Sequence, residues 1–309
     1  MNVLVIKLGA LGDVILALPA MAAIRRHHAA DRITILTTPA FASLLRKSGY
    51  ADEVITTARA RPWQVVQWLK LAATLRRGHF SRIYDLQMND RTCLYFHLFW
   101  PLGKPEWVGI ARGCSHALPM AEFHRLHAFD RHVAELSLAG VPEIPQPDMS
   151  WLESDLSRYA LPADFALLVP GAAPGRPGKR WPAAHFGELA KGLQARGILP
   201  VVLGTRHEAE AASVILMACP QARSLVNQTG IEDIAALARK ARVAVGNDTG
   251  PTHVIAMAGC PSLVLFSGES DPAESAPRGA RVEILRQSPL SGLAPDTVLK
   301  MLGKLIAEA

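Results

Sequence analysis

Short apolar runs alternate with longer segments of mixed polarity along the whole chain, which is the pattern of parallel β-strands connected by helices. In the first half, the apolar runs predict buried strands at residues 2–7, 32–36, 53–56, 82–86 and 107–110. The segments between them predict helices at residues 14–27, 40–47, 63–77, 92–99 and 129–139.

A proline-rich segment, residues 141–147, interrupts this alternation, and a short helix is expected at residues 152–159. A second series of strands is predicted at residues 165–169, 199–203, 224–226, 243–245, 262–266 and 282–285. Its helices are expected at residues 183–195, 206–218, 231–240, 254–258 and 295–307. We therefore predict an α/β protein with two doubly wound, Rossmann-like domains that face a cleft. The predicted domains are residues 1–155 and 156–309, and the last helix is able to pack back on the first domain.

One strand end carries a dense polar motif, and ligands of open parallel sheets bind beyond the carboxyl ends of the strands. Residues 245–253 (VGNDTGPTH) follow a buried strand and precede a helix. Gly250 permits a tight turn and Pro251 suits a first helical turn, so the motif predicts a helix N-terminus that offers N–H groups to a phosphate. The polar side chains at the same end are Asp248, Thr249, Thr252 and His253. The structural alternative is that these side chains only cap the helix or pack against it.

A second candidate lies at the glycine turn after the first strand. Gly9 and Gly12 form GxxG rather than GxGxxG, and Asp31 precedes the second strand instead of closing it, so the dinucleotide-binding fingerprint is absent. The phosphate-binding pattern GxxxxGK[ST] is absent as well. Asp13 follows the turn at a helix start, where a carboxylate serves either as an N-cap or as a general base beside Lys7.

Composition indicates a protein with sizeable cores, because 50% of the 309 residues are hydrophobic and the mean hydropathy is +0.16. No apolar run reaches the roughly 20 residues that a transmembrane helix needs. The run at residues 93–102 is expected in the core, with a membrane-touching face as the alternative. The first strand begins without a basic leader, and the four cysteines lack metal-ligand spacing. We expect a reduced, cytoplasmic protein without a structural metal.

The positive charge is unevenly distributed. The formal net charge is +6, and residues 59–131 hold 11 Lys and Arg against 5 Asp and Glu. A solvated face is the usual fate of such charge, and the alternative is that the local excess attracts an anionic partner. Nucleic acid is the less favoured partner, because the aromatic-basic and zinc patterns of its binding modules are absent. The arginines in or beside predicted loops of this stretch include Arg59, Arg61 and Arg112.

Three segments, in this order and at this spacing, resemble glycosyltransferase family 9, the lipopolysaccharide heptosyltransferases. They are residues 7–13 (KLGALGD) with 18–20 (LPA), residues 179–182 (KRWP) with 185–186 (HF), and residues 247–253 (NDTGPTH). The resemblance covers nearly the whole chain and implies a GT-B fold. It also implies an inverting transfer of heptose from ADP-heptose, without metal or cofactor, to an anionic, lipid-linked saccharide of the lipopolysaccharide inner core. A peripheral contact with the inner face of the cytoplasmic membrane fits such an acceptor.

The resemblance further implies roles for single residues. Asp13 would be the catalytic base, and Glu208, four residues after a strand-end glycine, would bind the ribose hydroxyls. The alternative for Glu208 is a first-turn helix charge, and for the loop cations of the donor side it is simple solvation. The donor side would comprise Lys179, Arg180, Asp248, Thr249, Gly250, Thr252 and His253. The acceptor side, taken from the glycine turn and the basic stretch, would comprise Lys7, Gly9, Gly12, Arg59, Arg61 and Arg112.

One departure leaves the donor sugar open: residues 172–174 read AAP, where heptosyltransferases often place Ser or Thr near the donor phosphates. No DxD carboxylate pair for a divalent ion is present, so Lys179 and a helix N-terminus would have to stabilise the leaving diphosphate. Alternative functions are a transferase that uses another nucleotide sugar and a protein of this fold that binds a glycan or nucleotide without turnover. An oxidoreductase is a further alternative, which the missing fingerprint disfavours.

Overall fold

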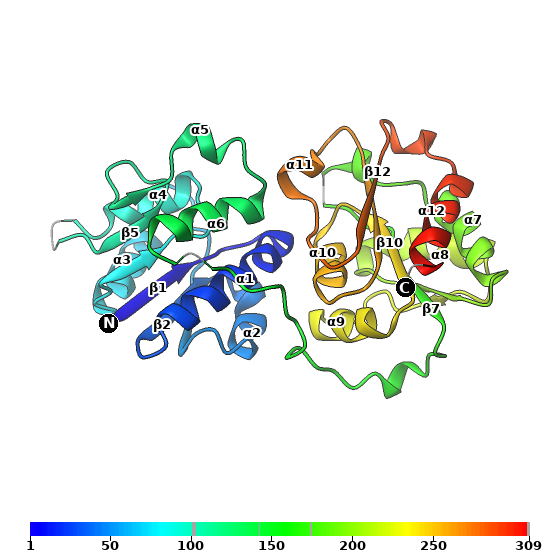
Figure 1. Cartoon of the computed structure of the whole chain (residues 1–309), viewed down its shortest axis with the longest axis horizontal. Coiled ribbons are helices and arrows are strands. Elements are labelled where there is room, and N and C mark those ends of the chain that lie inside the picture. Colours follow the sequence, from blue (N-terminus) through cyan, green and yellow to red (C-terminus); the bar gives the residue numbers. More distant parts are fainter. Residues whose placement is uncertain (101–102, 142, 174, 308–309) are drawn as a thin grey trace. The chain divides into compact units, whose positions relative to one another are not determined.

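A computed structural model describes residues 1–100, 103–141, 143–173 and 175–307, and it divides into two compact units, Met1–Gln146 and Pro147–Ala309 (Figure 1). Each unit is an α/β layer structure built on one parallel sheet, as the alternating pattern predicts. The expectations that include Leu102, Pro142 and Pro174 lie partly outside the described residues at those positions. None of the described helices has both the length and the apolar character needed to cross a membrane.

The first unit contains a six-stranded parallel sheet with the order β3-β2-β1-β4-β5-β6. Its strands are β1 (Asn2–Ile6), β2 (Arg32–Thr37), β3 (Glu53–Thr56), β4 (Arg82–Tyr84), β5 (Glu106–Gly109) and β6 (His116–Ala117). Its helices are α1 (Leu11–His27), α2 (Pro39–Lys47), α3 (Val65–Arg77), α4 (Asp90–His97), α5 (Met120–Phe123) and α6 (Ala128–Leu138). The chain direction across the sheet reverses between β1 and β4, which places the turn after β1 at the point where such sheets bind ligands.

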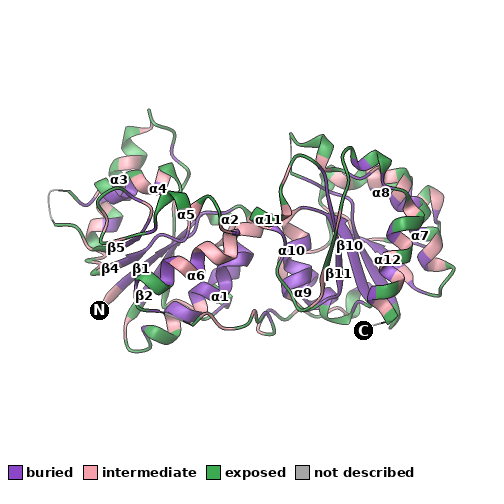
Figure 2. Cartoon of the chain, turned by 45° about the horizontal axis from the view of Figure 1, so that its top comes forward, coloured by how far each residue is buried: buried purple, intermediate pink, exposed green. Residues whose placement is uncertain are grey.

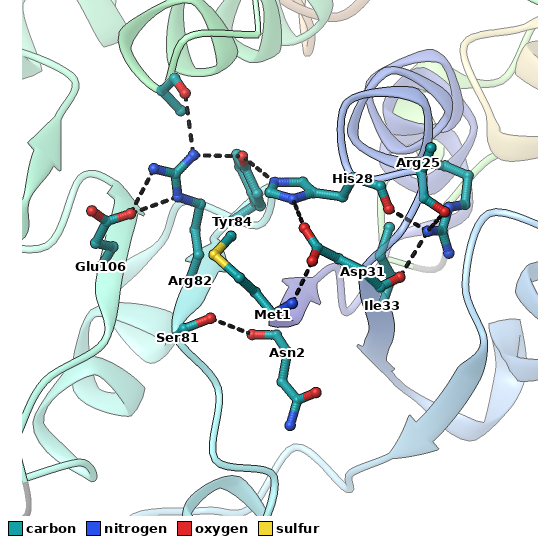
Figure 3. Close-up of polar contacts among 12 residues, drawn as sticks. Met1, Asn2, Arg25, His28, Asp31, Ile33, Ser81, Arg82, Tyr84 and Glu106 are labelled. Carbon is teal, nitrogen blue, oxygen red and sulfur yellow. Dashed lines mark hydrogen bonds and ion pairs between the residues drawn. The ribbon is translucent and has the colours of Figure 1, made fainter.

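The amino end of this sheet is closed by a polar network (Figure 3). His28 donates or accepts at both ring nitrogens, 2.7 Å from Asp31 Oδ2 and 2.9 Å from the Tyr84 hydroxyl. Asp31 also pairs with the amino group of Met1. This hydrogen bond is the largest cause of the lowered pKa of the Asp31 carboxyl, and the hydrogen bond from His28 is the second. Arg82 pairs with Glu106 on the neighbouring strand. Asp31 thus lies at the amino edge of the sheet, opposite the end where a ribose-binding acid of a dinucleotide fold would stand.

The second unit repeats the architecture with the order β12-β11-β10-β7-β8-β9. Its strands are β7 (Phe165–Val169), β8 (Leu199–Val202), β9 (Arg223–Ser224), β10 (Val243–Asn247), β11 (Ser262–Phe266) and β12 (Val282–Arg286). Its α-helices are α7 (Ala183–Gln194), α8 (Ala209–Ala218), α9 (Ile231–Lys240), α10 (Gly250–Met257), α11 (Pro272–Ser275) and α12 (Pro295–Ala307). Its 3₁₀ turns are η1 (Ser157–Tyr159), η2 (Pro177–Lys179), η3 (Arg206–Glu208) and η4 (Leu290–Gly292).

Strands β7, β10 and β11 are buried along their whole length, because helices cover both faces of the parallel sheet (Figure 2). The last helix, α12, packs on α7 and on β10 of its own unit. Its inward residues Val298, Leu302 and Leu305 belong to the core of this unit.

The segment between the two sheets differs from the expectation of a helix at residues 152–159. Only η1 is helical there, and the residues before it are bonded to α9. Arg239 donates to the carbonyl oxygens of Met149 and Leu152 at 3.0 and 2.7 Å, and Ser154 donates to Asp233 at 2.5 Å. These bonds attach the residues after Gln146 to the second unit, which therefore begins before the expected boundary at residue 156.

Candidate functional site

A pocket of about 500 Å³ lies at the carboxyl ends of β7, β8 and β10 in the second unit. Apolar side chains form one part of its wall, namely those of Val169, Leu203, Ile234 and Pro251. Polar residues form the rest, among them Arg180, Thr205, His207, Glu208, Thr229 and Thr249. An apolar wall beside convergent polar groups is the usual composition of a small-molecule site.

Three polar side chains, those of Lys179, Asp248 and His253, meet at the start of α10. Lys179 Nζ lies 2.6 Å from Asp248 Oδ2, and His253 Nε2 lies 3.8 Å from Asp248 Oδ1. Burial opposes ionisation of Asp248, but the His253 imidazole and the Lys179 ammonium outweigh it and lower the pKa of the Asp248 carboxyl to about 2. Asp248 is therefore an anion at neutral pH, and it holds Lys179 at the first turn of α10, where N–H groups and the helix dipole favour a phosphate.

Asn247 fixes the loop that carries Lys179, although the sequence analysis assigned it no role. Its side-chain nitrogen donates to the carbonyl oxygens of Pro170 and Gly171 at 2.8 and 3.2 Å, and its oxygen accepts from the Trp181 N–H at 3.0 Å. Trp181 is buried, and its indole donates to the Leu293 carbonyl oxygen at 2.9 Å. The sequence signal that could have identified this role is the position of Asn247 at the end of an apolar strand and at the start of the motif.

Glu208 closes the pocket beside two glycines. Its Oε2 accepts from the backbone N–H and the hydroxyl of Thr205 at 2.7 and 2.8 Å, which makes it the acid of a capping box. A Cβ on Gly204 would stand 2.7 Å from Glu208 Cβ, and one on Gly171 would stand 3.0 Å from its carboxyl carbon. The two glycines therefore allow the carboxylate to lie over the ends of β7 and β8. The structural and the binding role expected for Glu208 are compatible, because capping uses Oε2 and Oε1 faces Gly171.

The remaining donor-side residues divide between the pocket and the backbone. Thr249 and the exposed Arg180 line the pocket, and Gly250 begins α10 without a cap bond from the Thr249 side chain. The expected cap from Asp248 or Thr249 is thus absent from the described contacts of this helix. Thr252 is buried and donates its hydroxyl hydrogen to the Asn247 carbonyl oxygen at 2.8 Å, so its hydroxyl supports the turn.

In the first unit, the glycine turn after β1 presents Asp13. Helix α1 begins at Leu11, before the expected start, so Asp13 lies in the first turn rather than at the N-cap. Its Oδ2 accepts from the Ala10 N–H at 2.9 Å. Gly9 has φ +118, and a Cβ there would stand 2.5 Å from the Phe41 ring, so only glycine fits this turn. Gly12 lies in the same first turn of α1.

Lys7 lies beneath this turn in a buried charged cluster. Its ammonium donates to the Leu86 carbonyl oxygen at 2.7 Å, and burial lowers its pKa despite the nearby charges of Asp13, Glu135 and Asp85. Burial also raises the pKa of Asp85 to about 7 and that of Glu135 well above its usual value. Asp85 and Glu135 could not be assigned to this cluster from the sequence, since they come from the carboxyl end of β4 and from α6, far apart in the chain.

The three expected acceptor arginines take different places. Arg59 joins the turn, because its Nη2 donates to the Leu8 carbonyl oxygen at 2.9 Å. Arg61 is exposed on the segment before α3, where its guanidinium lies 5.4 Å from the Trp63 ring centroid. Arg112 is exposed in the loop between β5 and β6. The structure thus brings Lys7, Asp13 and Arg59 together around one turn.

In the described ranges, no group of three or more His, Cys, Asp or Glu side chains could hold a metal ion. The four cysteines are free thiols.

Comparison with known proteins gives a consistent family. The family model described as "Glycosyltransferase family 9 (heptosyltransferase)" matches residues 68–305. Lipopolysaccharide heptosyltransferase 2 of Salmonella typhimurium is 30% identical over 183 residues, which are 54% of this chain and 51% of that protein. The chain therefore matches about half the length of this relative.

Solved structures share the whole fold. The structure of E. coli ADP-heptose lipopolysaccharide heptosyltransferase II superposes with a TM-score of 0.79 and 22% identity, covering 100% of this chain and 99% of that chain. E. coli heptosyltransferase WaaC with ADP superposes with a TM-score of 0.75 and 20% identity, covering 99% and 100%. These likenesses confirm the predicted fold of two Rossmann-like units.

Proposed function

The chain belongs to glycosyltransferase family 9, and from this premise we propose that it transfers a heptose from ADP-heptose to a lipopolysaccharide inner-core saccharide. The observation that carries the proposal is the Lys179–Asp248 pair at the first turn of α10. It lies beside a pocket that has an apolar wall and the carboxylate of Glu208. One structural neighbour was determined with ADP, which supports an adenine nucleotide as the donor group.

The donor nucleotide would occupy the pocket of the second unit. Its adenine would pack on the apolar wall of Val169, Leu203 and Ile234, and its ribose hydroxyls would donate to Glu208 Oε1. The diphosphate would lie at the first turn of α10 against Lys179. Breaking the sugar–phosphate bond leaves negative charge on the nucleotide, and a fixed ammonium with backbone N–H groups stabilises that charge without a metal ion.

The acceptor hydroxyl would be deprotonated by Asp13 in the first unit. The Ala10 N–H holds Asp13 Oδ2, so the carboxylate is oriented and Oδ1 can accept a proton. Direct displacement by one hydroxyl with one base inverts the configuration at the anomeric carbon. Lys7, Gly9, Gly12, Arg59, Arg61 and Arg112 would bind the anionic acceptor around this turn.

The lipid-linked nature of the proposed acceptor implies work at the cytoplasmic face of the inner membrane, with the enzyme bound peripherally. The first unit would bind the acceptor and the second the donor, so the predicted acceptor domain (1–155) and donor domain (156–309) would correspond to these units with the boundary moved to Gln146.

Mass spectrometry tests the proposal by following sugar transfer from ADP-heptose to truncated lipopolysaccharide cores, with and without EDTA. We expect a product heavier by one heptose, formed equally in both conditions. A strict need for a divalent ion would contradict the metal-free mechanism. Tight binding of ADP without any product would instead favour a nucleotide-binding protein, and product from another nucleotide sugar only would reassign the donor.

A further inference from the structure

Helix α3 has a second apolar face that the core does not cover. Leu71 and Leu75 are buried in the first unit, whereas Val65, Val66 and Leu69 are 60–65% exposed. These three residues are related by spacings of three and four, so they share one side of the helix. A surface helix of a globular protein normally carries one apolar stripe, directed at the core. The second stripe therefore indicates an interaction surface.

The apolar surface extends beyond the helix. Trp63, just before α3, is 70% exposed and completes what we call the α3 patch: Trp63, Val65, Val66 and Leu69. Figure 2 shows α3 on the outside of its unit with exposed positions along it. Near the other end of the helix, Arg76 donates to the carbonyl oxygens of Leu98 and Trp100, at 2.8 Å each. Trp100 is itself 70% exposed, so a second indole lies on the segment bonded to α3.

The charge around the α3 patch has one sign. Residues 59–77 contain five cations and no acidic residue. Lys70 and Arg77 are exposed on α3, and Arg61 lies over the Trp63 ring at 5.4 Å. Aliphatic side chains and cations on one helix, with exposed indoles beside it, are the composition of segments that lie in the interface of an anionic bilayer.

A second copy of this chain fits the α3 patch less well. A two-fold interface would place the patch against the same patch, and it would bring five cations of one copy toward five of the other. Anionic lipid headgroups reverse that repulsion into attraction. Charge complementarity therefore favours a lipid surface over self-association.

The segment that leads into the α3 patch is bonded to the proposed acceptor turn. Arg59, at the start of the same basic segment, donates to the Leu8 carbonyl oxygen, and Arg91 donates to that of Ala60 at 2.6 Å. The segment between the turn and α3 is thus bonded to the unit at both places. The bond from Arg59 to Leu8 therefore ties the residues that lead into α3 to the turn that carries Asp13.

We propose that the α3 patch docks the protein on a bilayer of anionic phospholipids, with Trp63, Val66 and Leu69 entering the headgroup region. The choice of a lipid surface rests on the proposed function, because a lipid-linked acceptor has to be reached from the membrane. The docking delivers the acceptor turn to saccharides that project from the same surface.

Vesicle sedimentation of the full chain tests the proposal. Vesicles of equimolar phosphatidylglycerol and phosphatidylcholine should pellet the protein, and vesicles of phosphatidylcholine alone should pellet much less of it. The double variant Val66→Glu/Leu69→Glu should bind the anionic vesicles at least about tenfold more weakly, since it removes apolar insertion and adds repelled charge. The matched control is Val214→Glu/Met217→Glu on α8, which alters two exposed apolar residues at the same spacing and should bind like the wild type.

Several outcomes would overturn the docking proposal. One is equal binding by the α3 variant and the wild type, and another is failure of the wild type to bind the anionic vesicles. A third is a wild-type dimer in light scattering that the α3 variant converts to a monomer while vesicle binding stays unchanged, which would assign the patch to self-association. If the double variant did not fold, Trp63→Ser would replace it with the same expectations.

Transfer to a delipidated acceptor separates this proposal from the proposed function. The α3 variant should transfer heptose to that acceptor at the wild-type rate, because docking is not needed in solution. Absence of transfer by the wild type would count against the proposed function. The vesicle measurement would still decide the docking proposal independently.

Discussion

Asp13 has a structural and a proposed chemical role, and one substitution separates them. Asp13→Asn keeps a side-chain oxygen that can accept from the Ala10 N–H, but it cannot take a proton from the acceptor. We expect turnover to fall by about 10²–10⁴-fold, the usual contribution of a general base, with ADP affinity unchanged. Steady-state kinetics and calorimetric titration with ADP measure the two quantities. Full activity of Asp13→Asn would leave the residue as a helix-terminus acid only.

Lys179 is the cation that the donor diphosphate should meet, and its contribution is measurable. Lys179→Ala should weaken ADP binding by about 1.5–3 kcal/mol, the scale of a charge-assisted hydrogen bond, as determined by calorimetric titration. Lys191→Ala is the matched control, because Lys191 pairs with Glu188 on the exposed face of α7. Equal ADP affinities of the two variants would place the diphosphate elsewhere. The melting temperature of both variants should be measured as well, because Lys179→Ala leaves the buried Asp248 without its ammonium partner.

At the level of single residues, the sequence could predict which side chains belong to the site but not which of them are in contact. Lys179 and Asp248 both stood out from their motifs, yet their 2.6 Å contact depends on a loop folding back across the sheet. Asn247 directs that loop through three hydrogen bonds, and its neighbours in space, Gly171 and Trp181, are far from it in the chain. Thr252 looked like a phosphate donor from its position, whereas its hydroxyl is bonded to the backbone.

Two acids, Asp85 after β4 and Glu135 on α6, are buried in the first unit, and their burial gives this unit a pH dependence. Burial raises the pKa of Asp85 from 3.8 to about 7 in the folded protein. Between these values the folded state binds more protons than the unfolded state, so this group makes stability fall as pH rises from about 4 to 7. Glu135 acts in the same direction. Burial lowers the pKa of His132, so this group makes stability rise with pH at pH values below the usual histidine pKa of 6.5.

Asp85→Asn removes one titration and leaves the others in place. Relative to this variant, the wild type should lose thermal stability progressively between about pH 4 and 7, with no further relative change from Asp85 above that range. Asp164→Asn, at an exposed pair with Arg242, is the control and should run parallel to the wild type. Melting temperatures at several pH values measure this. Parallel profiles for Asp85→Asn and the wild type would show that Asp85 is charged throughout.

Long elements could be predicted from the sequence, but only some of the short ones could. The apolar runs at residues 165–169 and 262–266 coincide with β7 and β11, because a buried parallel strand is apolar on both faces. β6 has two residues, and it forms only because they pair with Val108 and Gly109. No local sequence pattern predicts this pairing. The helix expected at 152–159 was wrong because its segment is bonded to α9, and tertiary contacts outweighed local propensity.

For the whole molecule, the order of elements was sufficient to predict two doubly wound sheets. Each strand–helix–strand crossover favours one handedness, and few topologies then remain. The division between the units could be placed only near the proline-rich segment. Its position after Gln146 depends on contacts of residues such as Met149 and Leu152 with α9, which are made between segments distant in the chain.

The uneven charge of the whole chain leads to a prediction about salt. Residues 59–131 carry the basic excess, with Arg61 and Arg112 exposed, while the Lys179–Asp248 pair of the donor side is 12% and 8% exposed. Exposed charges are screened far more than buried ones. Salt should therefore raise the apparent KM for a soluble anionic acceptor more than the apparent KM for ADP-heptose.

Transfer kinetics from about 0.05 to 0.5 M NaCl measure this, over a range in which the Debye length falls from above 10 Å to well below it. A delipidated acceptor keeps membrane binding out of the measurement. Arg61→Gln/Arg112→Gln should flatten the salt dependence of the acceptor KM, because fewer exposed contacts remain to be screened. Arg223→Gln on β9 of the other unit is the control and should keep the wild-type slope. A donor KM that responds to salt as strongly as the acceptor KM would remove the basic stretch from the acceptor site.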